Sequence, residues 1–290
     1  MKKYTQMYRP IYRTVPSQIA QVGEGMNVLR PLPARGLRKV GPFIMLDHFG
    51  PHNLPIGKTG DVPPHPHAGF QTVTYLFKGK GLHRDSSGAM QEILPGGVNW
   101  MTAGRGIVHA EQMAGDPTDG KVEGFQIWVD LPRDQKFTAP GFDGMTPEQL
   151  PVRNLEGGQV RVIAGNWSDT VSQVRTFSPL FLYHLTLFEG AEVEVPVDPT
   201  FAAGIYTAEG EVEINEESWV ERSILTVFEP GEGSILVKAK SDAQLMVMGG
   251  APLNQPMASY GPFVMSTQEE LQQVMDDYRQ GKMGEVEWKE

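Results

Sequence analysis

Two short segments of this chain each carry a pair of potential metal ligands, and their spacing constrains the fold more than any other feature. The first segment begins His65-Pro66-His67, and the second ends His109-Ala110-Glu111. Residues i and i+2 of a β-strand point to the same face. If the two strands meet inside a barrel, three imidazoles and one carboxylate converge, and a borderline divalent metal favours that donor set.

A structural explanation of the same residues has to be weighed first. Histidines two residues apart are common, and the first pair alone would be interpreted as structural or incidental. The second pair changes that interpretation because it repeats the spacing and adds a carboxylate. A buried carboxylate without a partner is costly or stays protonated, and a metal would remove that cost. The sequence therefore predicts a metal site formed by His65, His67, His109 and Glu111.

The donor set also narrows the choice of metal. Structural zinc sites usually contain thiolates, and this chain has no cysteine. Three imidazoles and one carboxylate leave open positions on a six-coordinate ion, where O2 or a bidentate substrate could bind. We expect Fe(II) first, with Mn, Ni, Co, Cu or Zn as alternatives.

The composition favours a β-rich protein and excludes some partners. The 290 residues include 33 glycines and 23 prolines, which indicates many tight turns. The net charge of −10 argues against direct binding to nucleic acid, which requires a basic surface. No apolar run approaches the ~18 residues that a membrane span needs. We expect a cytoplasmic protein without a membrane partner.

Alternating valines and glutamates in the second half, as in Glu192-Val193-Glu194-Val195, predict half-buried strands. A loop-like stretch rich in proline and glycine runs from about residue 132 to residue 151. We therefore predict a metal-binding domain over 1–135, a linker over 136–150 and a second domain over 151–290. The only histidine of the second domain is His184, so we expect no metal there.

Strand parity leads to two further expectations around the ligands. If one strand continues from His65 to Phe77, Gln71 shares the ligand face and could lie behind the metal ligands. Gly104 and Gly106 flank Arg105 and predict a bend just before the strand that carries His109.

One helix is expected near the end of the chain. Ser266 with Glu269 predicts a capping box. Helical spacing and glycine stop signals follow in Leu271, Val274, Met275, Tyr278, Gly281 and Gly284.

These segments resemble a known family. The residues that carry the resemblance are 65–73, 100–111 and 126–129, with 41–47, 249–253 and 261–265. They are similar to the signature of the pirins, a branch of the cupins. The resemblance implies an all-β bicupin: two stacked antiparallel β-barrels of the jelly-roll type, with a C-terminal α-helix. It also implies a metal in the N-terminal barrel, with ligands at the same four positions. Many relatives have glutamate where this chain has Gln71.

The resemblance implies an activity as well, since several pirins resemble quercetin 2,3-dioxygenases. The substrate would be a flavonol, or a similar enol or diol, together with O2. Glu111 would be the catalytic residue that accepts the proton of the flavonol 3-hydroxyl, and ring cleavage would release carbon monoxide. Phe43, Met45, Phe70 and Gln71 are candidates for the pocket wall.

Two other interpretations remain open. Some pirin relatives act as regulators, so this chain could be a metal-responsive module that binds a transcription factor or a metabolic enzyme. The metal could also be purely structural. No coiled coil or long exposed apolar element demands assembly, so we expect a monomer.

Overall fold

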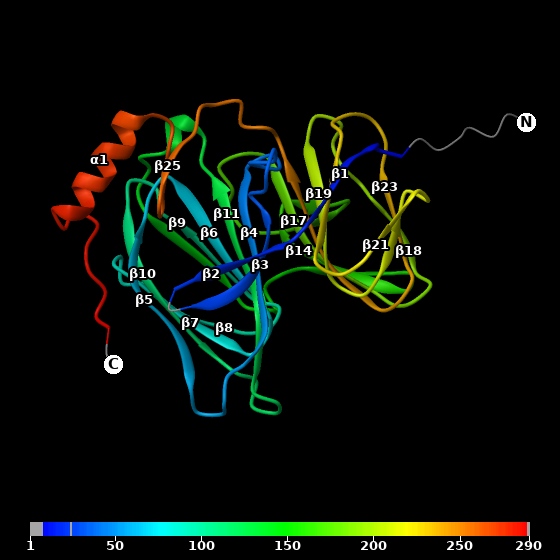
Figure 1. The fold of residues 1–290 in the computed structure, drawn as a ribbon, viewed down its shortest axis with the longest axis horizontal. Helices are drawn as coiled ribbons and strands as arrows, with labels where there is room; N and C mark the ends of the chain where they lie inside the picture. Colours follow the sequence, from blue (N-terminus) through cyan, green and yellow to red (C-terminus); the bar gives the residue numbers. More distant parts are fainter. Residues whose placement is uncertain (1–7, 24, 289–290) are drawn as a thin grey trace, which may run out of the picture. The chain divides into compact units, whose positions relative to one another are not determined.

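The computed structural model describes residues 8–23 and 25–288, which form two compact units built almost entirely of β-strands (Figure 1). Unit 1 contains the chain up to Gln18, Pro31–Phe43 and Leu150–Pro252. Unit 2 contains Ile19–Arg30, Ile44–Gln149 and the chain from Leu253 onward. The predicted all-β fold with one α-helix is confirmed.

Unit 2 is built around two antiparallel sheets, and the predicted ligands lie on neighbouring strands of the smaller one. The larger sheet has the order β12 (Gly141–Met145), β9 (Val98–Thr102), β6 (Phe70–Lys78), β11 (Lys121–Asp130), β4 (Phe43–Asn53), β3 (Met26–Leu32) and β2 (Gln18–Val22). The smaller sheet has the order β5 (Thr59–His67), β10 (Ile107–Ala114), β7 (Lys80–Asp85) and β8 (Met90–Ile93). A short 3-10 helix, η1 (Arg133–Gln135), follows β11.

Unit 1 has the same two-sheet plan. Its larger sheet contains β1 (Ile11–Pro16), β22 (Ile224–Phe228), β19 (Ala202–Glu209), β24 (Ala243–Gly250), β17 (Leu180–Leu187), β14 (Gly158–Ala164) and β13 (Val152–Leu155). Its smaller sheets contain β18 (Glu192–Val195), β23 (Ile235–Ala239), β20 (Val212–Ile214) and β21 (Ser218–Val220), with the ribbon β15 (Asn166–Trp167) and β16 (Thr170–Val171). The predicted alternation holds in β18, where the valines are buried in the apolar core and the glutamates are exposed.

The division into units is not a simple division of the chain into halves. The longest continuous segment of unit 2 ends at Gln149, and that of unit 1 begins at Leu150. This boundary falls at the end of the predicted linker 136–150. However, β1 pairs with β22, so the first strand of the described chain belongs with the second half. Conversely, the segment from Leu253 belongs to the unit that carries the histidines. Strand alternation cannot reveal such exchanges, because it gives the face of a strand and not its partner.

The last segment of unit 2 consists of the hairpin β25 (Ala258–Tyr260) and β26 (Phe263–Met265), followed by α1 (Gln268–Arg279). Figure 1 shows α1, in red, beside β25. The capping box is formed by Thr267 and Glu270, one residue later than predicted from Ser266 and Glu269. Ser266 instead donates its backbone N–H to the Glu270 carboxylate, at 2.9 Å. Leu271 and Val274 are buried as expected.

The chain changes sheets between β5 and β6, at Ala68 and Gly69. Gly69 has a φ of +85°, and a Cβ atom there would lie 1.9 Å from the Val264 carbonyl oxygen. The turn therefore requires glycine and holds β26 against the crossing point. It also breaks the predicted continuous strand from His65 to Phe77. The face of β6 that looks toward Glu111 carries Thr74 and not Gln71.

A buried lysine forms hydrogen bonds to both segments that meet where the chain changes sheets. Lys136 is fully buried and pairs with Asp130. Its ammonium also donates to the carbonyl oxygens of Gly69 and Val264, each at 2.8 Å. Burial lowers the pKa of Lys136, and Asp130 opposes that shift. The charge is thus compensated by a carboxylate and two carbonyls that belong to the crossing itself.

Within the described residues, no helix has the length and apolar character required to cross a membrane.

His184 in β17 is a packed histidine, as expected for the single histidine of the second half. Its Nε2 donates to Gln244 Oε1 at 2.5 Å, and burial lowers its pKa to about 4 against the effect of that hydrogen bond. The unfolded chain would bind a proton at about pH 6.5, whereas the folded chain would not.

We therefore expect stability to fall as the pH drops from about 6.5 to about 4, because the unfolded state gains a proton that the folded state excludes. This one group contributes at most about 1.4 kcal/mol per pH unit. In urea unfolding across this pH range, the free energy of unfolding should fall less steeply with decreasing pH for His184→Gln than for the wild type. An unchanged slope would contradict the assignment.

Candidate metal centre

The predicted ligands of β5 and β10 lie side by side in unit 2. His65 pairs directly with His109 in the antiparallel ladder, and Ile107 pairs with His67. A β-bulge falls between His109 and Glu111, so that Glu111 pairs with Val62. The donor atoms of His65, His67 and His109 all lie within 4.8 Å of one another. The predicted bend before β10 is present, because Gly104 and Gly106 both have positive φ.

Backbone carbonyls orient two of these imidazoles. His65 Nδ1 lies 2.9 Å from the Pro63 carbonyl oxygen, and His67 Nδ1 lies 3.3 Å from that of Pro262. A carbonyl oxygen can only accept, so each Nδ1 carries the hydrogen and each Nε2 keeps a free lone pair. Metal-binding histidines typically show this arrangement, in which the second ring nitrogen donates to a fixed acceptor.

His109 is the residue of the cluster whose buried nitrogens most need a ligand. Its side chain is 1% exposed. Neither of its ring nitrogens has a hydrogen-bond partner within the part of the chain that the structure describes. A buried imidazole without any partner is rare and costly. Donor atoms of two histidines already lie close to it, so a metal ion fits these residues.

Burial keeps two imidazoles of the cluster, those of His67 and His109, in the neutral form. Burial, with a smaller contribution from His65, lowers the pKa of His67 to about 3. Burial and the neighbouring histidines also lower the pKa of His109 well below 6.5. Neutral imidazole is the form that binds a metal, so the site offers its nitrogens at neutral pH without releasing protons.

Glu111 lies near His109 but belongs to a second group of donors. Its carboxylate, with His83 and His109, forms a set of donor atoms that also lie within 4.8 Å of one another. Thr74 donates its hydroxyl to Glu111 Oε1 at 2.8 Å, which leaves Oε2 available. His83 and Thr74 were not predicted. The spacing His83-Arg84-Asp85 repeats the i, i+2 signal of the ligand pairs and could have identified His83.

The predicted pocket residues have different positions. Phe70 contacts the His67 ring at a centroid distance of 5.1 Å and packs on Trp128 at 4.3 Å, so it borders the cluster. Gln71 lies on the opposite face of β6, where its amide donates to Thr102. Phe43 and Met45 are buried in β4. The residue of that strand that belongs to the apolar cluster around Phe70 is Ile44, which lies between them in the sequence. Gln71 differs from the expectation because strand parity was counted from His65 to Phe77, and the turn at Gly69 changes which residues of β6 face the ligands.

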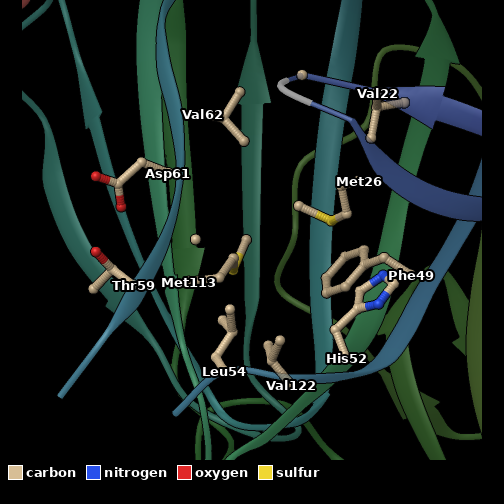
Figure 2. Close-up of a pocket in the computed structure, with 12 residues that line it drawn as sticks. Val22, Met26, Phe49, His52, Leu54, Thr59, Asp61, Val62, Met113 and Val122 are labelled. Carbon is tan, nitrogen blue, oxygen red and sulfur yellow. The ribbon is translucent and has the colours of Figure 1, made fainter. Parts of the chain in front are cut away.

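A separate pocket of about 290 Å³ lies between β5 and the β2–β3 hairpin (Figure 2). Val62 and Met113 point into it, whereas Asp61 points away. Its lining is mostly apolar and includes Val22, Met26, Phe49, Leu54 and Val122. Val62 pairs with Glu111, so the pocket begins beside the donor residues without including them.

Two β-barrels, one with a cluster of histidines and a carboxylate that could hold a metal ion, define a protein of the bicupin class. Comparison with known proteins supports the same class. Residues 25–129 match the model of the Pirin family, and residues 182–284 match the Pirin C-terminal cupin domain. The chain belongs to the pirin family.

Several relatives cover nearly the whole chain. A pirin-like protein of Caulobacter vibrioides is 39% identical over 262 residues, covering 89% of each chain. A pirin-like protein of Solanum lycopersicum is 35% identical over 279 residues, covering 95% of this chain and 93% of that one. The crystal structure of a quercetin 2,3-dioxygenase from Acinetobacter baumannii superposes with a TM-score of 0.91 at 31% identity, covering 97% of this chain and 100% of that one.

The crossing at Gly69 yields a prediction about metal binding. Gly69→Ala should lower the free energy of unfolding by about 3 kcal/mol or more, because the new methyl group adds left-handed strain to an overlap with Val264. The displaced segment carries the Pro262 carbonyl that orients His67, so metal affinity should fall as well.

Gly57→Ala is the matched control. Gly57 has a φ of +82° but nothing within 4 Å of its Cβ position. Its cost should be limited to the backbone strain of about 1–2 kcal/mol, with unchanged metal affinity. Denaturant unfolding and metal titration measure both effects. Equal losses in the two variants would show that the Val264 contact does not matter.

Proposed function

We propose that this protein is a metal-dependent dioxygenase of the quercetin 2,3-dioxygenase type, acting on a flavonol or a similar enol or diol. The observation that carries the proposal is the group of three clustered imidazoles, two of them buried and neutral, with a carboxylate beside it. The similarity to the Acinetobacter enzyme supports the substrate class.

His65, His67, His109 and Glu111 would hold the metal, with Fe(II) as the first candidate. The two carbonyl-bound histidines present Nε2, and His109 contributes a nitrogen that otherwise has no partner. A bound divalent ion would supply Lewis-acid polarisation of a substrate oxygen and a template for O2. Nitrogen and oxygen donors without thiolate suit iron, manganese, cobalt, nickel or copper.

Glu111 is the catalytic base in this proposal. The Thr74 hydroxyl holds its Oε1, so Oε2 is the atom that accepts the proton of the flavonol 3-hydroxyl. The resulting flavonolate reacts with O2, both oxygen atoms enter the products, and carbon monoxide leaves as the heterocycle opens. A positioned base of this kind contributes about 10²–10⁴-fold to the rate.

The aromatic wall beside the cluster supports a planar substrate. Phe70 and Trp128 pack on each other with ring planes 33° apart, and both contact the His67 ring. Aromatic faces favour planar ring systems through offset stacking and edge contacts. This wall is the part of the site where we expect the flavonol rings to lie.

The test combines metal analysis with oxygen uptake. We expect one metal per chain after loading with Fe(II), and oxygen uptake with quercetin that depends on that metal. His109→Ala should weaken metal binding by more than about 100-fold, since even groups that only orient a ligand contribute 10–100-fold. It should also abolish oxygen uptake. His184→Gln, which changes a packed histidine of unit 1, should retain both properties.

The outcomes separate the candidate functions. Stoichiometric metal without oxygen uptake under iron, manganese, nickel, cobalt or copper loading would contradict the enzyme and favour the regulatory module. A folded wild-type protein that binds no metal would contradict the site itself.

A further inference from the structure

Six polar side chains form a layer across the interior of unit 2, on two rows of paired residues that face each other. The first row runs through Gln126, Thr74, Asn99 and Gly144, paired across β11, β6, β9 and β12. The second row runs through Val62, Glu111, His83 and Gln91, paired across β5, β10, β7 and β8. Directly paired residues present their side chains on the same face of a sheet.

Two contacts fix how the rows are aligned. The Thr74 hydroxyl donates to Glu111 at 2.8 Å. At the other end, a Cβ atom on Gly144 would lie 1.9 Å from Gln91 Oε1. Asn99 lies between Thr74 and Gly144 in the first row, and His83 lies between Glu111 and Gln91 in the second. Asn99 and His83 therefore face each other across the interior.

His83 has the environment of a metal-binding histidine. Its Nε2 donates to Asp85 Oδ2 at 3.1 Å, so Nδ1 keeps a free lone pair. Asp85 Oδ1 is in turn held by the backbone N–H and the hydroxyl of Ser87, at 2.8 and 2.6 Å. The His83 ring stacks on Phe142 at a centroid distance of 4.7 Å. A carboxylate that fixes one ring nitrogen orients the other toward a metal.

The amide of Asn99 is an independent sign that something binds here. Its side chain is 2% exposed. Across residues 8–23 and 25–288, neither its Nδ2 nor its Oδ1 has a hydrogen-bond partner. Buried side-chain amides are almost always paired, with protein or with ordered water. The Oδ1 atom of an asparagine is a suitable neutral ligand for a divalent cation.

His109 links this layer to the outer histidines. It is a member of both donor groups, with His65 and His67 and with His83 and Glu111. Both of its ring nitrogens are without partners among the described residues. No existing hydrogen bond therefore prevents His109 from binding a metal together with either group. The second group is entirely buried, whereas His65 in the first is only half-buried.

We propose that unit 2 contains a second, inner position for a divalent metal, formed by His83 Nδ1, His109 and Glu111 Oε2, with Asn99 Oδ1 as a fourth donor. The position shares both His109 and Glu111 with the four ligands of the proposed function, and one carboxylate cannot compensate two dications, so one ion occupies one position at a time. The inference rests on the metal part of the proposed function and is independent of the reaction.

The test uses the full chain, stripped of metal and titrated with Co(II) alone. Bound metal is measured by elemental analysis, and its ligand field by visible absorption. His65→Ala/His67→Ala removes the outer donors and leaves the inner group intact. We expect this double variant to bind one Co(II) per chain at the inner donors, at least about 100-fold more weakly than the wild type, since even groups that only orient a ligand contribute 10–100-fold. Adding His83→Phe, which keeps a ring against Phe142, should abolish the remaining binding.

Controls separate folding from binding. His52→Ala, which removes a histidine of unit 2 outside both groups, should bind like the wild type. If the alanine pair does not fold, His65→Gln/His67→Gln replaces it in the same scheme. A folded double variant that binds no Co(II), or Co(II) binding that survives His83→Phe, would overturn the inner position.

The titration also distinguishes the two proposals. A wild type that binds Co(II) while the double variant does not would overturn only the inner position. A wild type that binds none would overturn the inner position and the proposed metal enzyme together.

Discussion

The close approach of the backbone at Gly69 is the constraint on which the site depends. The chain leaves the sheet that carries His65 and His67 and enters the other sheet within two residues. Only a residue without a Cβ atom fits there against the Val264 carbonyl. Lys136 then bonds both carbonyls of the contact and is neutralised by Asp130. Through this contact the last segment of the chain reaches the ligand strand and supplies the carbonyl that orients His67.

The site is assembled at a cost to the fold. Burial keeps His67 and His109 in the neutral form, and His109 has no partner for either nitrogen in the described chain. Unpaired buried polar groups typically cost about 1–3 kcal/mol each. The apolar core of unit 1 has no such cluster among its described residues, and its only histidine is packed against Gln244. The two units thus share a sheet plan but differ in what their interiors contain.

Much of this architecture could be predicted from the sequence. Period-2 alternation predicted strands such as β18, and the spacing of His65, His67 and His109 predicted three donors that the structure brings within 4.8 Å. The family resemblance and the two-barrel fold are confirmed. The assignment of four ligands to one metal remains a proposal, since the structure groups Glu111 with His83.

Other features depended on tertiary structure that local pattern does not encode. Gln71 was assigned to the ligand face because parity counting cannot detect a turn at positive φ, and Thr74 was missed for the same reason. Residues 41–45 and 261–265 differ at one position only, Ile44 against Val264, and both segments form the same kind of turn. Gly41 and Gly261 both have positive φ, and the pairs Val40–Phe43 and Tyr260–Phe263 close the two turns. The exchange of terminal segments between units involves partners far apart in sequence, which alternation alone cannot assign.

We expect a metal in unit 2 to be bound through His109. The most direct test is diffraction at the absorption edge of the metal, from crystals of the full chain loaded with one equivalent of Fe(II) or Co(II). We expect one anomalous peak in unit 2, about 2.0–2.1 Å from a ring nitrogen of His109, with further donors from the neighbouring histidines and Glu111. A peak that does not contact His109, or no peak in crystals of a loaded protein, would contradict it.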